Sequence, residues 1–144
     1  MYLIDTNVVS EARKKGRANP GVLAFFERVG ASDESTYLSA VSVGELRRGV
    51  ELVRRRGDIE QAGLLEAWLT VVLEQYEDKI LAFDSDAAQV WGRSRVPDPG
   101  HPLDKQIAAI ALVNDLILVT RNTSDFMGLG VKLSNPFFSV TDSK

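Results

Sequence analysis

Short apolar runs alternate along the chain with longer stretches in which apolar residues recur every three or four positions. Runs of this length predict strands, and the longer spacing predicts amphipathic helices. The expected strands are 2–4, 36–39, 79–83, 116–120 and 131–133. The expected helices are 8–14, 20–29, 42–56, 58–76, 85–95 and 104–114. Strands that alternate with helices indicate an α/β sandwich around a parallel sheet.

Two of these strands matter most for function. Residues 116–120 are nearly all apolar and β-favouring, so we expect them to form a central strand that is buried on both faces. Ligands of open parallel sheets bind beyond the carboxyl ends of the strands. Asp5 directly follows the first strand, and Asp125 lies shortly after residues 116–120. Both acids are therefore expected at the binding edge.

Local signals set the expected helix ends. Asp5, Thr6 and Asn7 can accept hydrogen bonds from free N–H groups at the start of the first helix. Gly30 is expected to end the second helix. Ser42 with Glu45 three residues later has the spacing of a capping box, which gives Glu45 a purely structural explanation.

Length and composition indicate one ordinary globular domain. The chain has 144 residues, of which 44% are hydrophobic and 26% charged. We expect a single domain over residues 1–140 and a short tail over 141–144. No apolar run is long enough to span a bilayer and the start lacks the features of a signal peptide, so a cytoplasmic protein is expected.

The rare residue types exclude several kinds of site. There is no cysteine, which excludes disulfides and thiolate zinc sites. His101 is the single histidine, so neither a two-histidine ribonuclease nor a multi-histidine metal site is possible. It lies in the turn-like segment Pro99-Gly100-His101-Pro102, and we interpret it as a loop residue.

Charge is distributed unevenly around a net value of −3. Residues 1–56 hold ten Lys or Arg against seven Asp or Glu, whereas residues 57–144 hold seven against thirteen. The basic clusters at 13–15, 47–48 and 54–56 could contact phosphates. They could equally be solvated helix surfaces.

Four acids in separate segments are the candidate chemistry: Asp5, Glu45, Asp104 and Asp125. Each alone has a simple structural explanation as a helix cap, a capping-box partner, a first-turn acid or a turn residue. If the fold brings them together, their mutual repulsion requires a cation. Oxygen ligands suit Mg²⁺ or Mn²⁺, and these ions serve phosphodiester chemistry.

The helix that begins near Asp104 is rich in alanine. Ala108 and Ala111 lie on the same side of this helix as Asp104. Their small side chains could leave room for a metal ion and a phosphate. The alternative is that they only allow close packing of the helix on the sheet.

The chain also resembles a known family. Four segments in the same order look like the motifs of PIN-domain nucleases, and more closely like those of VapC toxins, including the FitB-like branch. The segments are Met1–Asn7, Val43–Leu46 with Gly49, Leu103–Ala109 and Val119–Phe126. The resemblance covers residues 1 to about 140, and all four acidic positions are intact.

The resemblance implies a PIN-like three-layer α/β/α sandwich with a short-stranded, mainly parallel sheet. It also implies an endoribonuclease that uses one or two Mg²⁺ or Mn²⁺ ions. Asp5, Glu45, Asp104 and Asp125 would be the catalytic residues and metal ligands. The neighbours expected to orient them are Thr6, Asn7, Thr120 and Asn122. Arg48, about one turn after Glu45, is expected to contact RNA or to be an ordinary surface arginine.

The implied partners are an RNA substrate and a VapB-like antitoxin, in a homodimer and a toxin–antitoxin hetero-oligomer. The apolar stretch Leu64–Leu73 and the first helices could form the antitoxin groove, a homodimer surface or simple core.

Three other readings remain open. A PIN nuclease that processes RNA without an antitoxin would use the same chemistry. A phosphatase of the haloacid dehalogenase type also begins with a strand that ends in aspartate, but it typically has a second aspartate where this chain has Asn7. A catalytically silent binding module would not need all four acids.

Overall fold

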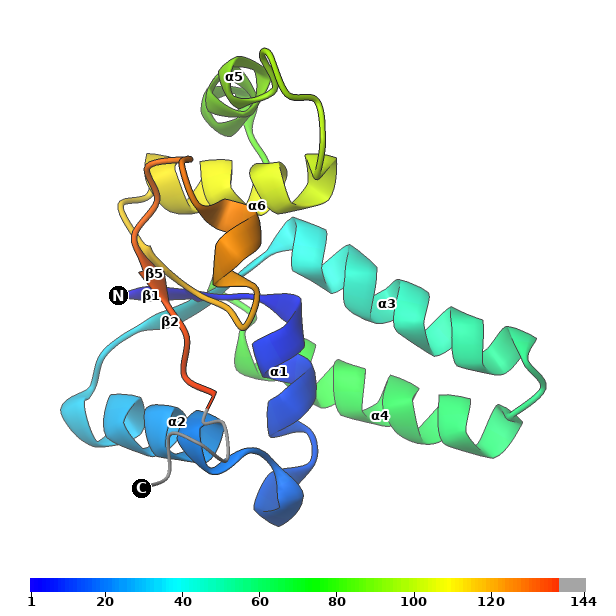
Figure 1. Cartoon of the computed structure of the whole chain (residues 1–144). Coiled ribbons are helices and arrows are strands. Elements are labelled where there is room, and N and C mark those ends of the chain that lie inside the picture. The colour runs from blue at the N-terminus through cyan, green and yellow to red at the C-terminus, as the bar shows by residue number, and fades with distance from the viewer. Residues whose placement is uncertain (138–144) are drawn as a thin grey trace.

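The computed structural model describes residues 1–137, and it shows a five-stranded sheet with helices on both faces (Figure 1). The expected tail over residues 141–144 lies outside the described residues. All strand pairs are parallel, in the order β3-β2-β1-β4-β5. The strands are β1 (Tyr2–Ile4), β2 (Thr36–Ser39), β3 (Ile80–Leu81), β4 (Ile117–Val119) and β5 (Leu133–Ser134).

The middle of the sheet is β1, whereas the sequence predicted residues 116–120 in that place. β4 lies directly beside β1 and is paired on its other edge by β5, so it is an interior strand that is one position off centre. In the register between them, Leu3 pairs with Leu118 and Ile4 pairs with Val119. The most apolar strand therefore adjoins the strand that ends in Asp5.

Helices form the two outer layers (Figure 1). One layer holds α1 (Thr6–Ala12), α2 (Pro20–Ser32), α3 (Ala40–Arg55) and α4 (Ile59–Gln75). The other holds α5 (Ser85–Ser94) and α6 (Pro102–Val113). Two 3₁₀ turns, η1 (Lys15–Arg17) and η2 (Thr123–Phe126), follow α1 and β4. The three-layer α/β/α sandwich is confirmed. No helix in the described part of the chain is long and apolar enough to cross a membrane.

The alternation of side chains along each strand builds one core on each face of the sheet. Ile4 and Val119 pack with the helices of the α1–α4 layer. Their neighbours Leu3 and Leu118 pack with α6 on the other face. Since both β1 and β4 contribute to both cores, the pair is buried on both faces, as parallel strands usually are.

Two predicted helix ends were wrong. α2 runs through Gly30 to Ser32, and the left-handed residue at its end is Asp33, at φ 57°, whose N–H donates to the carbonyl of Val29. Next, α3 begins at Ala40, because Ser39 rather than Ser42 caps it and accepts from the Ser42 N–H. Glu45 therefore lies outside any capping box.

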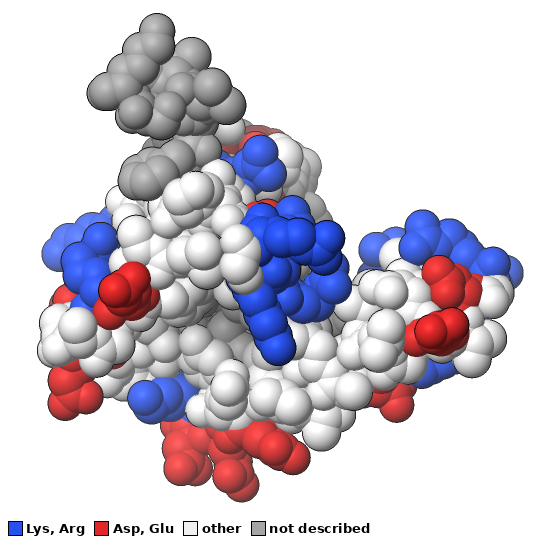
Figure 2. Space-filling view, turned by 90° about the horizontal axis from the view of Figure 1, so that it is seen from below, with Lys and Arg blue, Asp and Glu red and all other residues white. Residues whose placement is uncertain are grey.

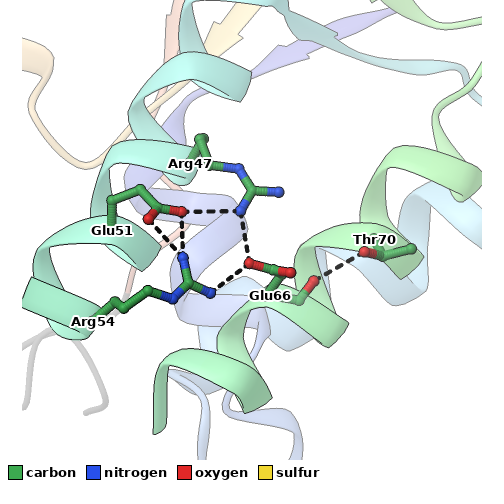
Figure 3. A network of polar contacts seen from close by, with 5 residues as sticks. All are labelled: Arg47, Glu51, Arg54, Glu66 and Thr70. Carbon is green, nitrogen blue, oxygen red and sulfur yellow. Dashed lines mark hydrogen bonds and ion pairs between the residues drawn. The ribbon is translucent and has the colours of Figure 1, made fainter. Parts of the chain in front are cut away.

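Helices α3 and α4 form a hairpin that projects from the body of the molecule (Figure 1; at the right of Figure 2). Its exposed side carries a network in which Arg47 and Arg54 each contact both Glu51 and Glu66 (Figure 3). The contacts of Arg54 are the shorter ones, at 2.6 Å to each glutamate. Because these side chains are exposed, we expect the network to contribute little to the stability of the fold.

The core can be tested with a matched pair of leucines. Leu118 is fully buried in β4, whereas Leu64 on α4 is 62% exposed. We expect Leu118→Ala to lower the free energy of unfolding by about 2–5 kcal/mol, because it leaves a cavity between the sheet and α6. Leu64→Ala should cost less than about 0.5 kcal/mol. Urea unfolding of both variants measures the difference, and equal losses would contradict this description of the core.

Candidate metal centre

The candidate site lies where β1 and β4 end side by side. From β1 the sheet continues in one direction through β2 and β3, and in the other through β4 and β5. The connections therefore diverge at the β1–β4 junction, which is the position where open parallel sheets bind ligands. Asp5 follows β1 and Thr120 follows β4, and both are buried. Asp5 lies at the carboxyl edge of the sheet, where the sequence placed it, and its role as a metal ligand stays a prediction.

Asp5 is held by three hydrogen-bond donors. Its Oδ1 accepts from the backbone N–H of Thr6 at 2.8 Å, so Asp5 also caps α1. Its Oδ2 accepts from the hydroxyl of Thr120 at 2.8 Å and from the amide of Asn7 at 3.3 Å. Burial raises the pKa of Asp5, and these hydrogen bonds oppose the rise. The carboxylate is thereby fixed in orientation from both strands.

Asn7 joins the ends of β1 and β4. Besides reaching Asp5, its amide nitrogen lies 3.4 Å from the Thr120 hydroxyl, and its oxygen accepts from the Arg121 N–H at 3.1 Å. Asn7 therefore links Asp5 to the end of β4, and Asp5 rather than Asn7 caps α1. Asn122 contributes through its backbone, whose N–H donates to the Thr120 hydroxyl at 3.1 Å.

Glu45 reaches the same edge from α3. The hydroxyl of Thr6 donates to Glu45 Oε1 at 3.1 Å, which links α3 to the first turn of α1. Thr6 thus contacts Glu45, and its role in orienting this acid for catalysis stays a prediction. Arg48 lies exposed on the next turn of α3, and its contact with RNA stays a prediction.

Asp104 shows that the four acids share one electrostatic environment. It lies in the first turn of α6 and is partly buried. The pKa of Asp104 is raised, first by burial and then by the negative charges of Asp5, Asp125 and Glu45. Asp125 comes from η2, directly after β4. The fold therefore brings the four predicted acids to one edge.

His101 is a loop residue, as the sequence predicted, but it lies closer to the acids than the sequence indicated. It stands directly before α6 in the left-handed region, at φ 52°, and Pro102 begins the helix. Its Nδ1 lies 3.8 Å from Asp104 Oδ2. Donor atoms of His101, Asp104 and Asp125 all lie within 4.8 Å of one another. The spacing of three residues between His101 and Asp104 at a helix start was the signal available in the sequence.

The alanines of α6 do not line the metal centre as the sequence suggested. Ala108, Ala109 and Ala111 are at most 2% exposed and pack in the core between α6 and the sheet. The alternative reading, close packing of helix on sheet, is therefore correct. Lys105 is also buried, and its ammonium group donates to the backbone carbonyl of Asp98, which ties the loop before α6 to the helix.

The donor set suits a hard divalent cation. Four carboxylates from separate segments converge, with hydroxyl and amide groups that orient them. Among residues 1–137, no Lys or Arg forms an ion pair with any of the four acids, and the one basic neighbour recorded is His101. Such uncompensated negative charge with oxygen ligands fits Mg²⁺ or Mn²⁺.

Comparison with known proteins gives a consistent result. The chain matches the PIN domain family over residues 2–127. It is 32% identical to toxin FitB of Neisseria gonorrhoeae, covering 95% of this chain and 99% of FitB. It is also 32% identical to VapC ribonuclease Y4jK of Sinorhizobium fredii, covering 95% and 98%. The crystal structure of FitAcB from N. gonorrhoeae superposes with a TM-score of 0.80, at 32% identity, over 94% of this chain and 98% of that chain.

The raised pKa of Asp104, caused first by burial and then by the charges of the neighbouring acids, predicts a stability change with a definite sign. Because the folded-state pKa of Asp104 lies above its ordinary value of 3.8, the ionised carboxylate destabilises the ion-free fold at neutral pH. The penalty is absent below about pH 3.8, grows as pH rises through the interval up to the raised pKa, and is constant above it. We expect Asp104→Asn to melt about 2–4 °C higher than wild type at pH 7 in EDTA.

The control is Asp98→Asn, because the pKa of Asp98 is lowered by the N–H of Gly100 and by Lys105. Removing that charge should leave the melting temperature unchanged or lower it. Differential scanning calorimetry from pH 4 to pH 8 measures both variants. An Asp104→Asn variant that is less stable than wild type at pH 7 would refute the repulsion.

Proposed function

The chain belongs to the PIN-domain family, and on this basis we propose that it is a metal-dependent endoribonuclease that acts as the toxin of a toxin–antitoxin pair. The observation that carries the proposal is the convergence of Asp5, Glu45, Asp104 and Asp125 at the carboxyl edge of the sheet. The name of one relative, toxin FitB, supports the role as a toxin. The name of another, VapC ribonuclease Y4jK, supports the ribonuclease activity.

The four acids would hold one or two Mg²⁺ or Mn²⁺ ions. Asp5 and Asp104 are the best candidates for direct ligands, and Glu45 and Asp125 would complete the site directly or through water. When bound, the ion supplies a water of lowered pKa and neutralises charge that develops on the phosphate. Thr6, Asn7 and Thr120 keep the carboxylates in place, so little reorganisation is needed when an ion and a phosphodiester enter.

An antitoxin segment would bind between α1, α2 and α4, where the structure has a groove of about 420 Å³. Its walls are mainly apolar and include Val9, Phe26, Trp68 and Val71. Val71 is 49% exposed although it is apolar, which is consistent with a surface that a partner covers. The homodimer expected from the sequence stays a prediction.

Nuclease activity has a direct test. We expect purified protein to cut labelled RNA into discrete fragments with Mg²⁺ or Mn²⁺, and not in EDTA. Asp5→Asn and Asp104→Asn should each lower the rate about 100-fold or more, the size of effect that losing metal stabilisation implies. Asp115→Asn is the matched control, because Asp115 is an exposed residue beyond the other end of α6.

The single histidine gives an independent readout of ion binding. Because His101 is the only imidazole in the chain and lies beside Asp104, bound Mn²⁺ should broaden its proton NMR signals strongly in wild type and much less in Asp104→Asn.

In the cleavage experiment, RNA that stays intact while a phosphomonoester is hydrolysed would overturn the proposed nuclease activity and favour a phosphatase.

The groove between α1, α2 and α4 can be tested by introducing one charged side chain into it. We expect Val71→Asp to weaken binding of the cognate antitoxin at least tenfold, because an unpaired carboxylate would be desolvated in the interface, while RNA cleavage by the free protein is unchanged. Leu64→Asp is the control, since Leu64 lies on the same helix but outside the groove. Calorimetric titration of both variants decides. Equal affinity for wild type and Val71→Asp would show that the antitoxin binds elsewhere.

A further inference from the structure

A block of basic side chains covers the loop at the end of α1. Arg13, Lys14, Lys15 and Arg17 are all exposed, and Figure 2, which views the molecule from below, shows Lys and Arg gathered in a compact block at its centre. These four residues, here called the basic loop, line a shallow cavity of about 580 Å³ together with Gln61 of α4. Every side chain of the lining is polar, and four of the five are cationic.

Most of this charge is unneutralised. Lys14 forms an ion pair with Glu11 at 2.9 Å. For Arg13, Lys15 and Arg17, the structure records no ion pair with any acid among residues 1–137. Three free cations in one cavity repel one another, so the arrangement is stabilised when an anion enters.

Lys15 adds a conformational argument. Its backbone lies in the left-handed region at φ 53°, where glycine or asparagine is the usual residue. A lysine there strains the backbone, and in this conformation its side chain lines the same cavity as Arg13 and Arg17.

The basic loop and the acidic site occupy the two ends of α1. Asn7 belongs to the acidic site, and α1 extends from there for seven residues, which is ~10 Å at ~1.5 Å per residue. A strand with stacked bases advances ~3.4 Å along its axis per nucleotide, so about three nucleotides cover this distance. Between the two ends stands Arg121, whose N–H donates to Asn7 and whose charge helps to lower the pKa of Glu11 on α1.

We propose that the basic loop binds backbone phosphates of the RNA about three nucleotides away from the bond that is cut. The inference rests on the proposed function. The acidic site repels an RNA strand, so affinity for the strand has to come from cations elsewhere on the surface. An acidic protein segment is the competing ligand, because Arg13 and Lys15 also line the edge of the apolar groove between α1, α2 and α4. Lys14 and Arg17 lie outside that groove, and the cavity of the basic loop itself is lined by polar side chains alone, which favours a phosphate backbone.

The test compares two double variants with the same change in net charge. Lys15→Gln/Arg17→Gln alters the basic loop, and Arg55→Gln/Arg56→Gln alters exposed arginines at the far end of the α3–α4 hairpin. Both are made in full-length Asp104→Asn protein, so that RNA is bound without being cut. Affinity for a fluorescent single-stranded RNA is measured by anisotropy between 0.05 and 0.5 M salt.

We expect the loop variant to bind about 25-fold more weakly at 0.1 M salt, with a log–log salt slope that is shallower by about 1.4. Each of the two lost phosphate contacts makes the salt slope shallower by about 0.7. If the variant and the parent protein bind equally at 1 M salt, this change in slope gives the 25-fold difference at 0.1 M salt. The hairpin variant should change the affinity less than threefold. With the active site intact, the loop variant should raise KM for RNA and leave kcat unchanged.

Equal losses in the two double variants would overturn the proposal, because they would reflect only the overall charge. Unchanged RNA affinity in the loop variant, with weaker binding of the cognate antitoxin, would assign the basic loop to the protein partner instead. A wild-type protein that neither binds nor cuts RNA would remove the proposed function itself. Thermal melting of both variants checks that each remains folded.

Discussion

Everything at the candidate site depends on one buried carboxylate that two neighbouring strands hold in place. Asp5 ends β1, and its Oδ2 accepts from Thr120 at the end of β4, while its Oδ1 accepts from the first N–H of α1. One side chain thus joins the sheet, the helix and the acidic pocket. Because it is 4% exposed, the fold must supply these donors to keep it charged. The hydrogen bonds of Asp5 that cap α1 and join the two strand ends therefore also fix its carboxylate in the candidate site.

The pocket therefore shows a tension between stability and function. Burial and three neighbouring acids raise the pKa of Asp104, which means that the folded, ion-free protein holds charges that it would be more stable without. The two cores on the faces of the sheet provide the stability that tolerates this repulsion. When a divalent cation binds, the cluster of carboxylates stabilises the folded protein instead of destabilising it, because the same carboxylates then become ligands. Cation binding and folding stability are thus linked in this molecule.

The sequence predicted what local patterns determine and missed what tertiary packing decides. Apolar runs identified all five strands, and the position of Asp5 after the first of them placed it at the binding edge. The start of α3 was misplaced because Ser39 and Ser42 have the same capping chemistry, and only the end of β2 decides between them. The alanines of α6 pack against the sheet, which no periodicity distinguishes from lining a site. His101 was correctly placed in a loop, but its nearness to Asp125 could not be predicted because it exists only in three dimensions.

The pairing of β1 with β4 also has a consequence in time. Thr120 follows its hydrogen-bond partner Asp5 by 115 residues in the sequence, so it is synthesised much later than Asp5. The segments that carry Asp104 and Asp125 also come long after Asp5. On the ribosome, the acidic pocket therefore stays incomplete until the segment that carries Asp125 has emerged. Its assembly depends on contacts between distant segments, which form more slowly than contacts between neighbours in the sequence.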